Sequence, residues 1–152
     1  MKHFTALICA AALGGCASHL PQSAAVGIGA DGAITAGAVL TGAASEGNPL
    51  VTSWPVGVAS VLGRWALVAH YTHADEPGRT QALSSINAIT WGVVANNIAA
   101  VVWHSNPASL TIGAVAGWLV WHSTEEERQF AQVCAAERMR NPVLRCEYRR
   151  PS

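Results

Sequence analysis

Two histidines and a carboxylate at helical spacing are the first residues in the sequence that could take part in metal binding. His70 and His73 are three residues apart, one helical turn, and Asp75 follows closely, a donor set that a metal ion binds when further ligands join it. No further ligand cluster stands nearby, and the sequence contains neither the nucleophile elbow of hydrolases nor a GxxxxGK phosphate-binding loop. We therefore expect no metal centre, no catalytic residues and no enzyme activity, and we identify no small-molecule substrate.

Cys134 and Cys146 form a second chemically informative pair. Because neither has a CxxC partner, zinc binding is not expected. A helix that ends at Arg140, before Asn141 and Pro142, followed by an extended return would bring the two thiols together. Closing such a loop stabilises a fold by about 3 kcal/mol, and disulfides persist in oxidising compartments. The pair is a candidate disulfide, and a bonded pair would place this part of the chain in the periplasm.

Cys16 follows a short apolar run, residues 4–13, that begins just after a lysine and a histidine. A positive start, an apolar middle too short to span a bilayer and small residues at the end are the features of a secretory signal peptide. The motif Leu13-Gly14-Gly15-Cys16 resembles the lipobox of bacterial lipoproteins. The resemblance covers residues 1–17 and indicates a location rather than an activity.

This resemblance implies that residues 1–15 are removed and that Cys16 becomes the first residue of the mature chain. In lipoproteins this cysteine carries a covalent diacylglycerol and an N-acyl chain, and we expect no other cofactor. Each buried methylene group of such chains adds about 0.8 kcal/mol of membrane affinity. Ala17 stands where the family's inner-membrane retention signal has Asp, which by the family's sorting rule favours the outer membrane.

Charged residues are few and unevenly distributed. They make up 12% of the 152 residues, whereas 51% are hydrophobic. The charged fraction is low for a soluble domain. Between Ala17 and Ser123 the chain has six charged side chains, whereas the stretch from Glu125 to Arg150 has five acidic residues and six arginines. The formal net charge is zero, so no nucleic-acid partner is expected. The lipid bilayer is the expected partner of the middle region.

Three apolar segments in that region have the features of helices. Residues 53–71 begin with Ser53 and Pro55, residue types typical of a first helical turn. Residues 84–103 are long enough to cross the hydrocarbon core of a bilayer. Residues 107–122 are shorter, but their tryptophans suit the headgroup region. The alternative is a soluble bundle with these segments as its core, and the scarcity of polar outer faces argues against it.

The sequence thus predicts an all-α fold, a small helical membrane bundle of two to three short apolar helices. We divide the chain into a cleaved signal peptide (1–15), a lipidated Gly/Ala-rich tether (16–50), a helical membrane domain (51–122) and a charged helical C-terminal tail (123–152). The tether is predicted because small side chains gain little from burial and glycine loses much backbone freedom on ordering. A Gly-lined helix packed against others is the alternative, which Asp31 would interrupt.

Two sets of residues are candidates for organising the membrane domain. Ser109, Gly113 and Gly117 share one helix face that lets another backbone approach, within the chain or between copies. Polar residues in the apolar segments would form a buried hydrogen-bonded cluster or line a polar path; they are Arg64, Asn87, Thr90 and Asn97. In the tail, the spacing of Ser123 and Glu126 fits a capping box, which predicts a helix start there.

The side of the membrane occupied by the tail depends on the number of crossings. With Cys16 outside the cytoplasm, three crossings put Arg79 and the arginine-rich tail inside, in agreement with the positive-inside rule. We favour this orientation, in the inner membrane of a bacterial cell envelope. The candidate disulfide argues against a cytoplasmic tail, because a periplasmic tail and an acylated Cys16 require an even number of crossings, two or four. Ala17 argues against the inner membrane. The outer membrane therefore stays open as an alternative.

These features predict a non-catalytic, membrane-anchored envelope lipoprotein with a structural or protein-interaction role. We expect it to self-associate as a homo-oligomer through small-residue helix faces, or to bind another envelope protein. A holin-like or other pore-forming protein is the first alternative, because Arg64 and the asparagines would suit a water-lined oligomer. An exclusion or immunity lipoprotein of a mobile element is the second alternative, and no particular residue supports it.

Overall fold

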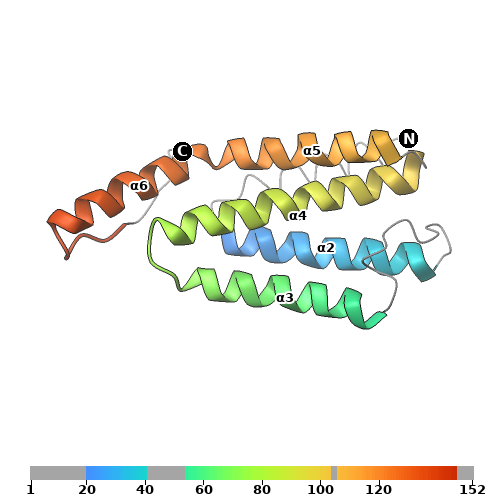
Figure 1. Cartoon of the computed structure of the whole chain (residues 1–152), viewed down its shortest axis with the longest axis horizontal. Coiled ribbons are helices and arrows are strands. Elements are labelled where there is room, and N and C mark those ends of the chain that lie inside the picture. Colours follow the sequence, from blue (N-terminus) through green and yellow to red (C-terminus); the bar gives the residue numbers. More distant parts are fainter. Residues whose placement is uncertain (1–19, 41–53, 104–105, 147–152) are drawn as a thin grey trace.

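The described part of the chain is entirely helical apart from its turns and ends (Figure 1). The computed structural model describes residues 20–40, 54–103 and 106–146. Its helices are α2 (Leu20–Leu40), α3 (Trp54–Thr72), α4 (Gly78–Trp103), α5 (Asn106–Ser123) and α6 (Glu125–Arg140). The all-α prediction is therefore confirmed for these residues. The predicted signal peptide and Cys16 lie outside the described residues.

The helices α2 to α5 run alternately in opposite directions. Contacts from Leu20 to Asn87 and from Asp31 to Asn97 show that α2 and α4 are parallel. Helix α5 runs antiparallel to α4, and α3 runs antiparallel to both α2 and α4 (Figure 1). The start of α2, the turn between α3 and α4 and the end of α5 therefore share one end of the bundle. We call it the α6 end, because α6 continues from it.

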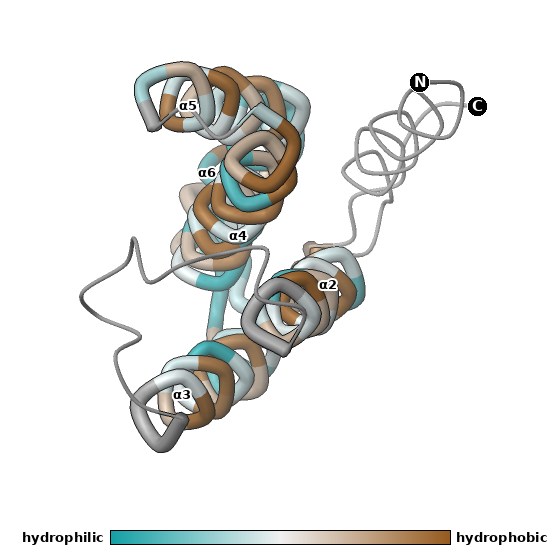
Figure 2. Tube along the Cα trace, turned by 90° about the vertical axis from the view of Figure 1, so that its right-hand side faces the viewer, coloured by the Kyte–Doolittle hydropathy of each residue, from teal (hydrophilic) through white to brown (hydrophobic). Residues whose placement is uncertain are grey.

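Helix α4 lies at the centre of the arrangement. Viewed along the helices, α2 and α3 pack against one side of α4, and α5 lies on the opposite side (Figure 2). A small apolar core joins the first three helices; its buried members are Leu20, Ala24, Ile28, Val68 and Leu83. The three α2 residues of this core are spaced four apart, so they form one stripe along the helix.

Helix α2 corrects the predicted tether. Over residues 20–40 the tether prediction is wrong, because this Gly/Ala-rich stretch is a 21-residue helix packed against α3 and α4. Its small residues allow close approach: a Cβ atom at Gly27 would lie 2.8 Å from the Cγ2 atom of Thr90 in α4. Asp31 does not interrupt the helix, because its carboxylate finds partners on both neighbouring helices. Residues 16–19 and 41–50 of the predicted tether lie outside the described residues.

The boundaries of the other helices follow local polar contacts. Helices α3 and α5 match the predicted segments to within one residue at each end. Helix α4 begins at Gly78, six residues before the predicted start, because the Glu76 carboxylate accepts hydrogen bonds from the backbone N–H and hydroxyl of Thr80. The capping-box prediction is wrong: Thr124 is the N-cap of α6 without a side-chain capping bond, and the Ser123 hydroxyl donates to the Val120 carbonyl.

Large apolar side chains remain exposed around the bundle. On α3, α4 and α5 those more than 40% exposed are Leu62, Trp65, Leu67, Ile89, Val102, Trp103, Leu110, Val115, Trp118 and Leu119. Among the described helices, α4 alone has the length and apolar composition needed to cross a membrane, and 28% of that stretch is buried. Length and composition thus identify one such helix among the described residues, whereas the apolar segments of the sequence predict two or three.

Candidate functional site: a polar chain across an apolar bundle

A chain of polar side chains crosses the bundle at the middle of α2. The Arg64 guanidinium on α3 lies 2.6 Å from the Asp31 carboxylate on α2. The other oxygen of that carboxylate accepts a hydrogen bond of 2.7 Å from the Asn97 amide on α4. Asn96 Nδ2 in turn donates to Asn97 Oδ1 at 3.3 Å. The chain therefore runs from α3 through α2 to α4 and holds three helices in one register.

The ion pair at the start of this chain is largely removed from solvent. The side chain of Asp31 is 7% exposed and that of Arg64 is 23% exposed. Isolated charges are costly in a low-dielectric environment, whereas a paired and hydrogen-bonded set is tolerated. The second carboxylate oxygen is satisfied by Asn97, and Arg64 Nε also donates to the backbone carbonyl of Ser60 at 3.4 Å. The pairing thus neutralises both charges inside the bundle.

The remaining predicted polar residues also face α2. Asn87 Nδ2 donates to the carbonyl of Leu20 at 2.9 Å, and one turn further along α4 Trp91 Nε1 lies 3.1 Å from the Ser23 hydroxyl. Thr90 is fully buried at the same interface. The structure thus brings Arg64, Asn87, Thr90 and Asn97 to the surfaces that contact α2. Because α2 occupies this position, the polar residues form an internal cluster rather than the wall of a path.

The small-residue face of α5 is used inside the chain. A Cβ atom at Gly113 would lie 2.8 Å from the Gly92 carbonyl oxygen of α4, and one at Gly117 would lie 2.9 Å from the Ala88 carbonyl oxygen. Ser109, one turn earlier, is 2% exposed. Gly113 and Gly117 therefore bring α5 against α4 at close backbone distance, and Ser109 is buried on the same face of α5. Helix α4 occupies the face that a second copy would need.

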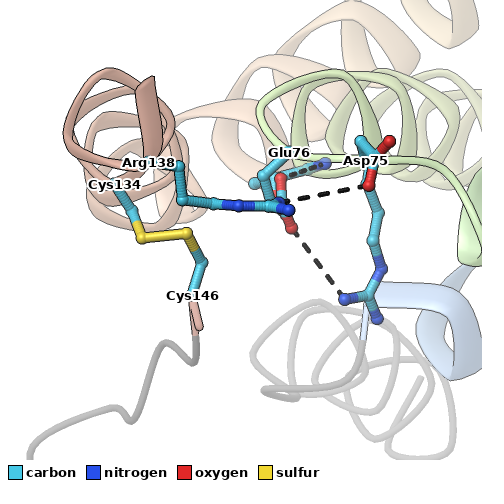
Figure 3. The surroundings of a disulfide bond; sticks show 7 residues. Asp75, Glu76, Cys134, Arg138 and Cys146 are labelled. Atoms are coloured by element: carbon cyan, nitrogen blue, oxygen red, sulfur yellow. Dashed lines mark hydrogen bonds and ion pairs between the residues drawn. A yellow bond between two sulfur atoms is a disulfide. The ribbon is translucent and has the colours of Figure 1, made fainter. Parts of the chain in front are cut away.

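The predicted cysteine pair forms a disulfide that closes the end of the tail (Figure 3). Cys134 lies in α6 and Cys146 in the return after Arg140, with their Cα atoms 5.9 Å apart. Arg138, one turn after Cys134, lies 4.0 Å from the Asp75 carboxylate in the turn between α3 and α4. The covalent loop is therefore located at the α6 end of the bundle.

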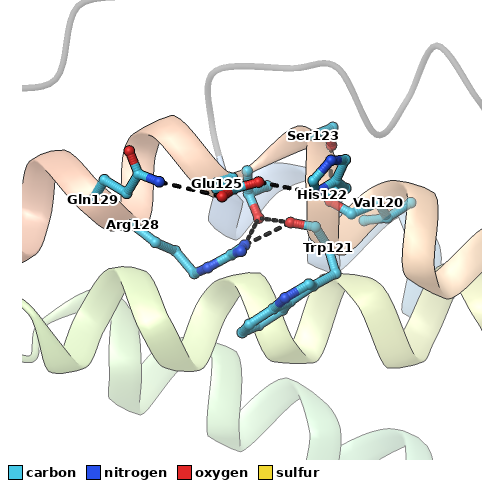
Figure 4. A network of polar contacts seen from close by, with 8 residues as sticks. Val120, Trp121, His122, Ser123, Glu125, Arg128 and Gln129 are labelled. Atoms are coloured by element: carbon cyan, nitrogen blue, oxygen red, sulfur yellow. Dashed lines mark hydrogen bonds and ion pairs between the residues drawn. The ribbon is translucent and has the colours of Figure 1, made fainter.

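An arginine connects α5 to α6 at the break around Thr124 (Figure 4). The Arg128 guanidinium carbon lies 3.6 Å from the ring centroid of Trp121, a favourable cation–π position. Its Nη1 donates to the Trp121 carbonyl near the end of α5, which also accepts hydrogen bonds from the Thr124 backbone N–H and hydroxyl. The same Nη1 donates to the Thr124 hydroxyl. Desolvation by burial lowers the pKa of Arg128, and Glu125 acts in the opposite direction. These contacts set the direction in which α6 leaves the bundle.

The histidines form no metal site with the residues described around them. His70 packs edge-on against Tyr71, and both His70 and His73 are exposed near the end of α3. The described residues contain no group of three or more His, Cys, Asp or Glu side chains that would hold a metal ion.

Comparison of the chain with known protein families, with curated proteins and with solved structures finds no match. The interpretation of the site therefore depends on its own geometry.

Several residues of the site were missed by sequence reasoning: Ser23, Asp31, Trp91, Gly92, Asn96 and Arg128. One signal for Asp31 was present. Asp31 is the single acidic residue between Cys16 and Glu46, and Arg64 is the single lysine or arginine between Cys16 and Arg79. Opposite charges isolated on apolar stretches are expected to pair.

Proposed function

We propose that this protein is a non-catalytic lipoprotein of a bacterial envelope, with its helical bundle embedded in the bilayer and an architectural or protein-contact role. The observation that carries this proposal is the contrast between the inside and the outside of the bundle. Charged groups pair inside, across Asp31 and Arg64, whereas large apolar side chains face outward on α3, α4 and α5. A water-soluble domain has the opposite distribution.

The outward apolar surface is extensive. Leu62 is 61% exposed, and Ile89 and Leu110 are each 65% exposed. Soluble monomers rarely expose contiguous apolar patches of more than a few hundred Å², and in a bilayer the same side chains carry no such cost. Assembly of the bundle also removes the charges of α2 and α3 from the lipid, which supports membrane insertion of helices that are individually only weakly apolar.

The arrangement of the helices supports four crossings. Leu20, four residues after Cys16, lies at the α6 end, and so does the disulfide. Lipid attachment to a lipoprotein cysteine and disulfide formation both occur outside the cytoplasm, so an even number of crossings satisfies both. Arg79 and the arginines of the tail are then outside, contrary to the positive-inside rule.

The pore-forming alternative loses its motivation. It depended on Arg64 and the asparagines facing a water-filled oligomer, but Arg64 and Asn97 bond to Asp31, and Asn87 bonds to Leu20, within one chain. An internal cluster of this kind supports a role in holding the bundle together.

The proposal predicts an acylated mature chain. Expressed in a bacterium that processes lipoproteins, the protein is expected in the membrane fraction, with an intact mass that starts at Cys16 and includes diacylglycerol and an N-acyl chain. Cys16→Ser removes the acceptor thiol, so fatty-acid labelling is expected to disappear. Cys9→Ser is the matched control, because Cys9 lies in the expected signal peptide and its loss leaves labelling unchanged. A wild-type chain without acyl mass that dissolves in plain buffer would refute the proposal.

A further inference from the structure

Three polar atoms on α4 are buried without a hydrogen-bond partner among the described residues: Ser84 Oγ, Asn87 Oδ1 and Thr90 Oγ1. Each of these side chains is at most 1% exposed. A buried hydroxyl or amide oxygen that makes no hydrogen bond destabilises a fold, so such atoms are rare in native proteins. Here they lie within two turns of one helix, which is unusual for a native interior.

Contacts with α2 hold two of these groups in place. Asn87 Nδ2 donates to the Leu20 carbonyl at 2.9 Å, which leaves Oδ1 as the amide atom that needs a donor. The Thr90 methyl group lies against Gly27, where a Cβ atom would be 2.8 Å from it. Turning the Thr90 hydroxyl elsewhere would move this methyl group out of its contact. The unpartnered oxygens therefore result from the packing of α2 on α4.

The spacing of the three residues suits a bridging water molecule. Ser84 and Thr90 lie three residues before and after Asn87, and Cβ atoms three residues apart on a helix are separated by about 5–6 Å. A water molecule with two hydrogen bonds of about 2.8 Å bridges oxygens up to about 5.6 Å apart. The asparagine oxygen accepts two hydrogen bonds, and each hydroxyl both donates and accepts. Water can donate to the amide oxygen and exchange hydrogen bonds with either hydroxyl.

We infer that the interface between α2 and α4 binds ordered water beside Asn87, with one molecule bridging Oδ1 to Ser84 Oγ and another bridging it to Thr90 Oγ1. Buried waters in proteins have this role, since they bond to polar groups that otherwise lack partners. A cation fits less well, because Asp31 is the one acidic residue of α2, α3 and α4 and is paired with Arg64. The inference does not depend on the proposed function, because the chain itself encloses the site.

Thr90→Val is a test in which the two possibilities have opposite signs. Valine keeps the methyl group at Gly27 and replaces the hydroxyl with a methyl group of similar shape. Loss of a hydroxyl that binds water is expected to raise the unfolding equilibrium constant in mixed micelles about fivefold. Thr111→Val is the matched control, because that exposed hydroxyl donates to the Pro107 carbonyl within α5, and a smaller change is expected. An unfolding constant that stays the same or falls in Thr90→Val would overturn the inference.

Oxygen-17 relaxation dispersion of the solvent detects the bound water itself. The method reports long-lived water oxygens and is not affected by exchange of hydroxyl protons. In folded samples of equal helicity, Ser84→Ala combined with Thr90→Val is expected to lower the dispersion amplitude of the full-length chain, whereas Thr90→Ser, which keeps the hydroxyl, retains it. Equal amplitudes in the wild type and the double variant would overturn the inference. Higher stability in sodium chloride than in choline chloride of equal ionic strength would assign the oxygens to a cation and overturn it as well.

Discussion

Replacing Asp31 with leucine is expected to lower the free energy of unfolding by about 3 kcal/mol, one of the two largest single effects that the structure predicts. The substitution leaves the Arg64 guanidinium without its counter-ion, which lies 2.6 Å away, and removes the acceptor of the Asn97 amide. Both orphaned groups lie among apolar helices, where an unpaired charge is costly. Reversible unfolding in mixed micelles, with titration by a denaturing detergent, measures the loss.

The double variant distinguishes an uncompensated charge from a change of shape. Asp31→Leu with Arg64→Met removes both charges, so most of the lost stability is expected to return. Asp75→Asn is the control for an exposed pair, because the Asp75 side chain is 95% exposed and 4.0 Å from Arg138; its expected effect is below about 0.5 kcal/mol. If the double variant were as unstable as Asp31→Leu alone, the ion pair would not explain the position of α2.

Gly113→Ala is the second large effect, with an expected loss of about 2 kcal/mol. The added methyl group would lie 2.8 Å from the Gly92 carbonyl oxygen and 2.8 Å from the Asn96 Cβ atom. Because the carbonyl belongs to the backbone of α4, the contact is relieved only if the two helices move apart. The same unfolding measurement in mixed micelles reports the loss.

Gly63→Ala is the matched control for this substitution. Gly63 also lies within a helix, but a Cβ atom there meets nothing within 4 Å. Alanine is favoured over glycine in a helix by about 0.5–1 kcal/mol, so this variant is expected to gain stability. The two Gly→Ala substitutions therefore have opposite expected signs. Equal effects would show that the close approach of α4 and α5 does not form.

Local patterns in the sequence predicted the features that depend on neighbouring residues. The starts of α3 and α5 follow from Pro55 and from Asn106-Pro107. The disulfide between Cys134 and Cys146 follows from a helix that ends at Arg140. These features depend on residues close together in the chain. Local rules therefore suffice for them.

The position of α2 depends on partners distant in the chain. Its polar contacts join Leu20 to Asn87, Ser23 to Trp91 and Asp31 to Asn97, each across 66 to 68 residues. Small and apolar residues lie on all faces of this Gly/Ala-rich stretch, so no amphipathic pattern in the sequence indicates which face is buried. Its stability as a helix comes from packing rather than from intrinsic propensity, so the sequence alone favoured a tether.

The polar residues were predicted as a group, but their arrangement was not. Periodicity placed Asn87, Thr90 and Asn97 on one side of the second apolar segment, and the structure has them facing α2. The partner helix was the missing information. The use of the Ser109, Gly113 and Gly117 face within the chain likewise depends on Gly92, which α4 places opposite.

The proposed topology places Leu20, four residues after the expected lipid attachment site, and the disulfide-closed tail together outside the cytoplasm. Of the four cysteines, Cys9 is expected to leave with the signal peptide and Cys16 to be acylated, so Cys134 and Cys146 are the thiols that remain to report on the tail. A membrane-impermeant maleimide is applied to cells with a permeabilised outer membrane and an intact inner membrane. The account predicts labelling only after reduction, and without lysis. Labelling that needs lysis but no reductant would contradict it.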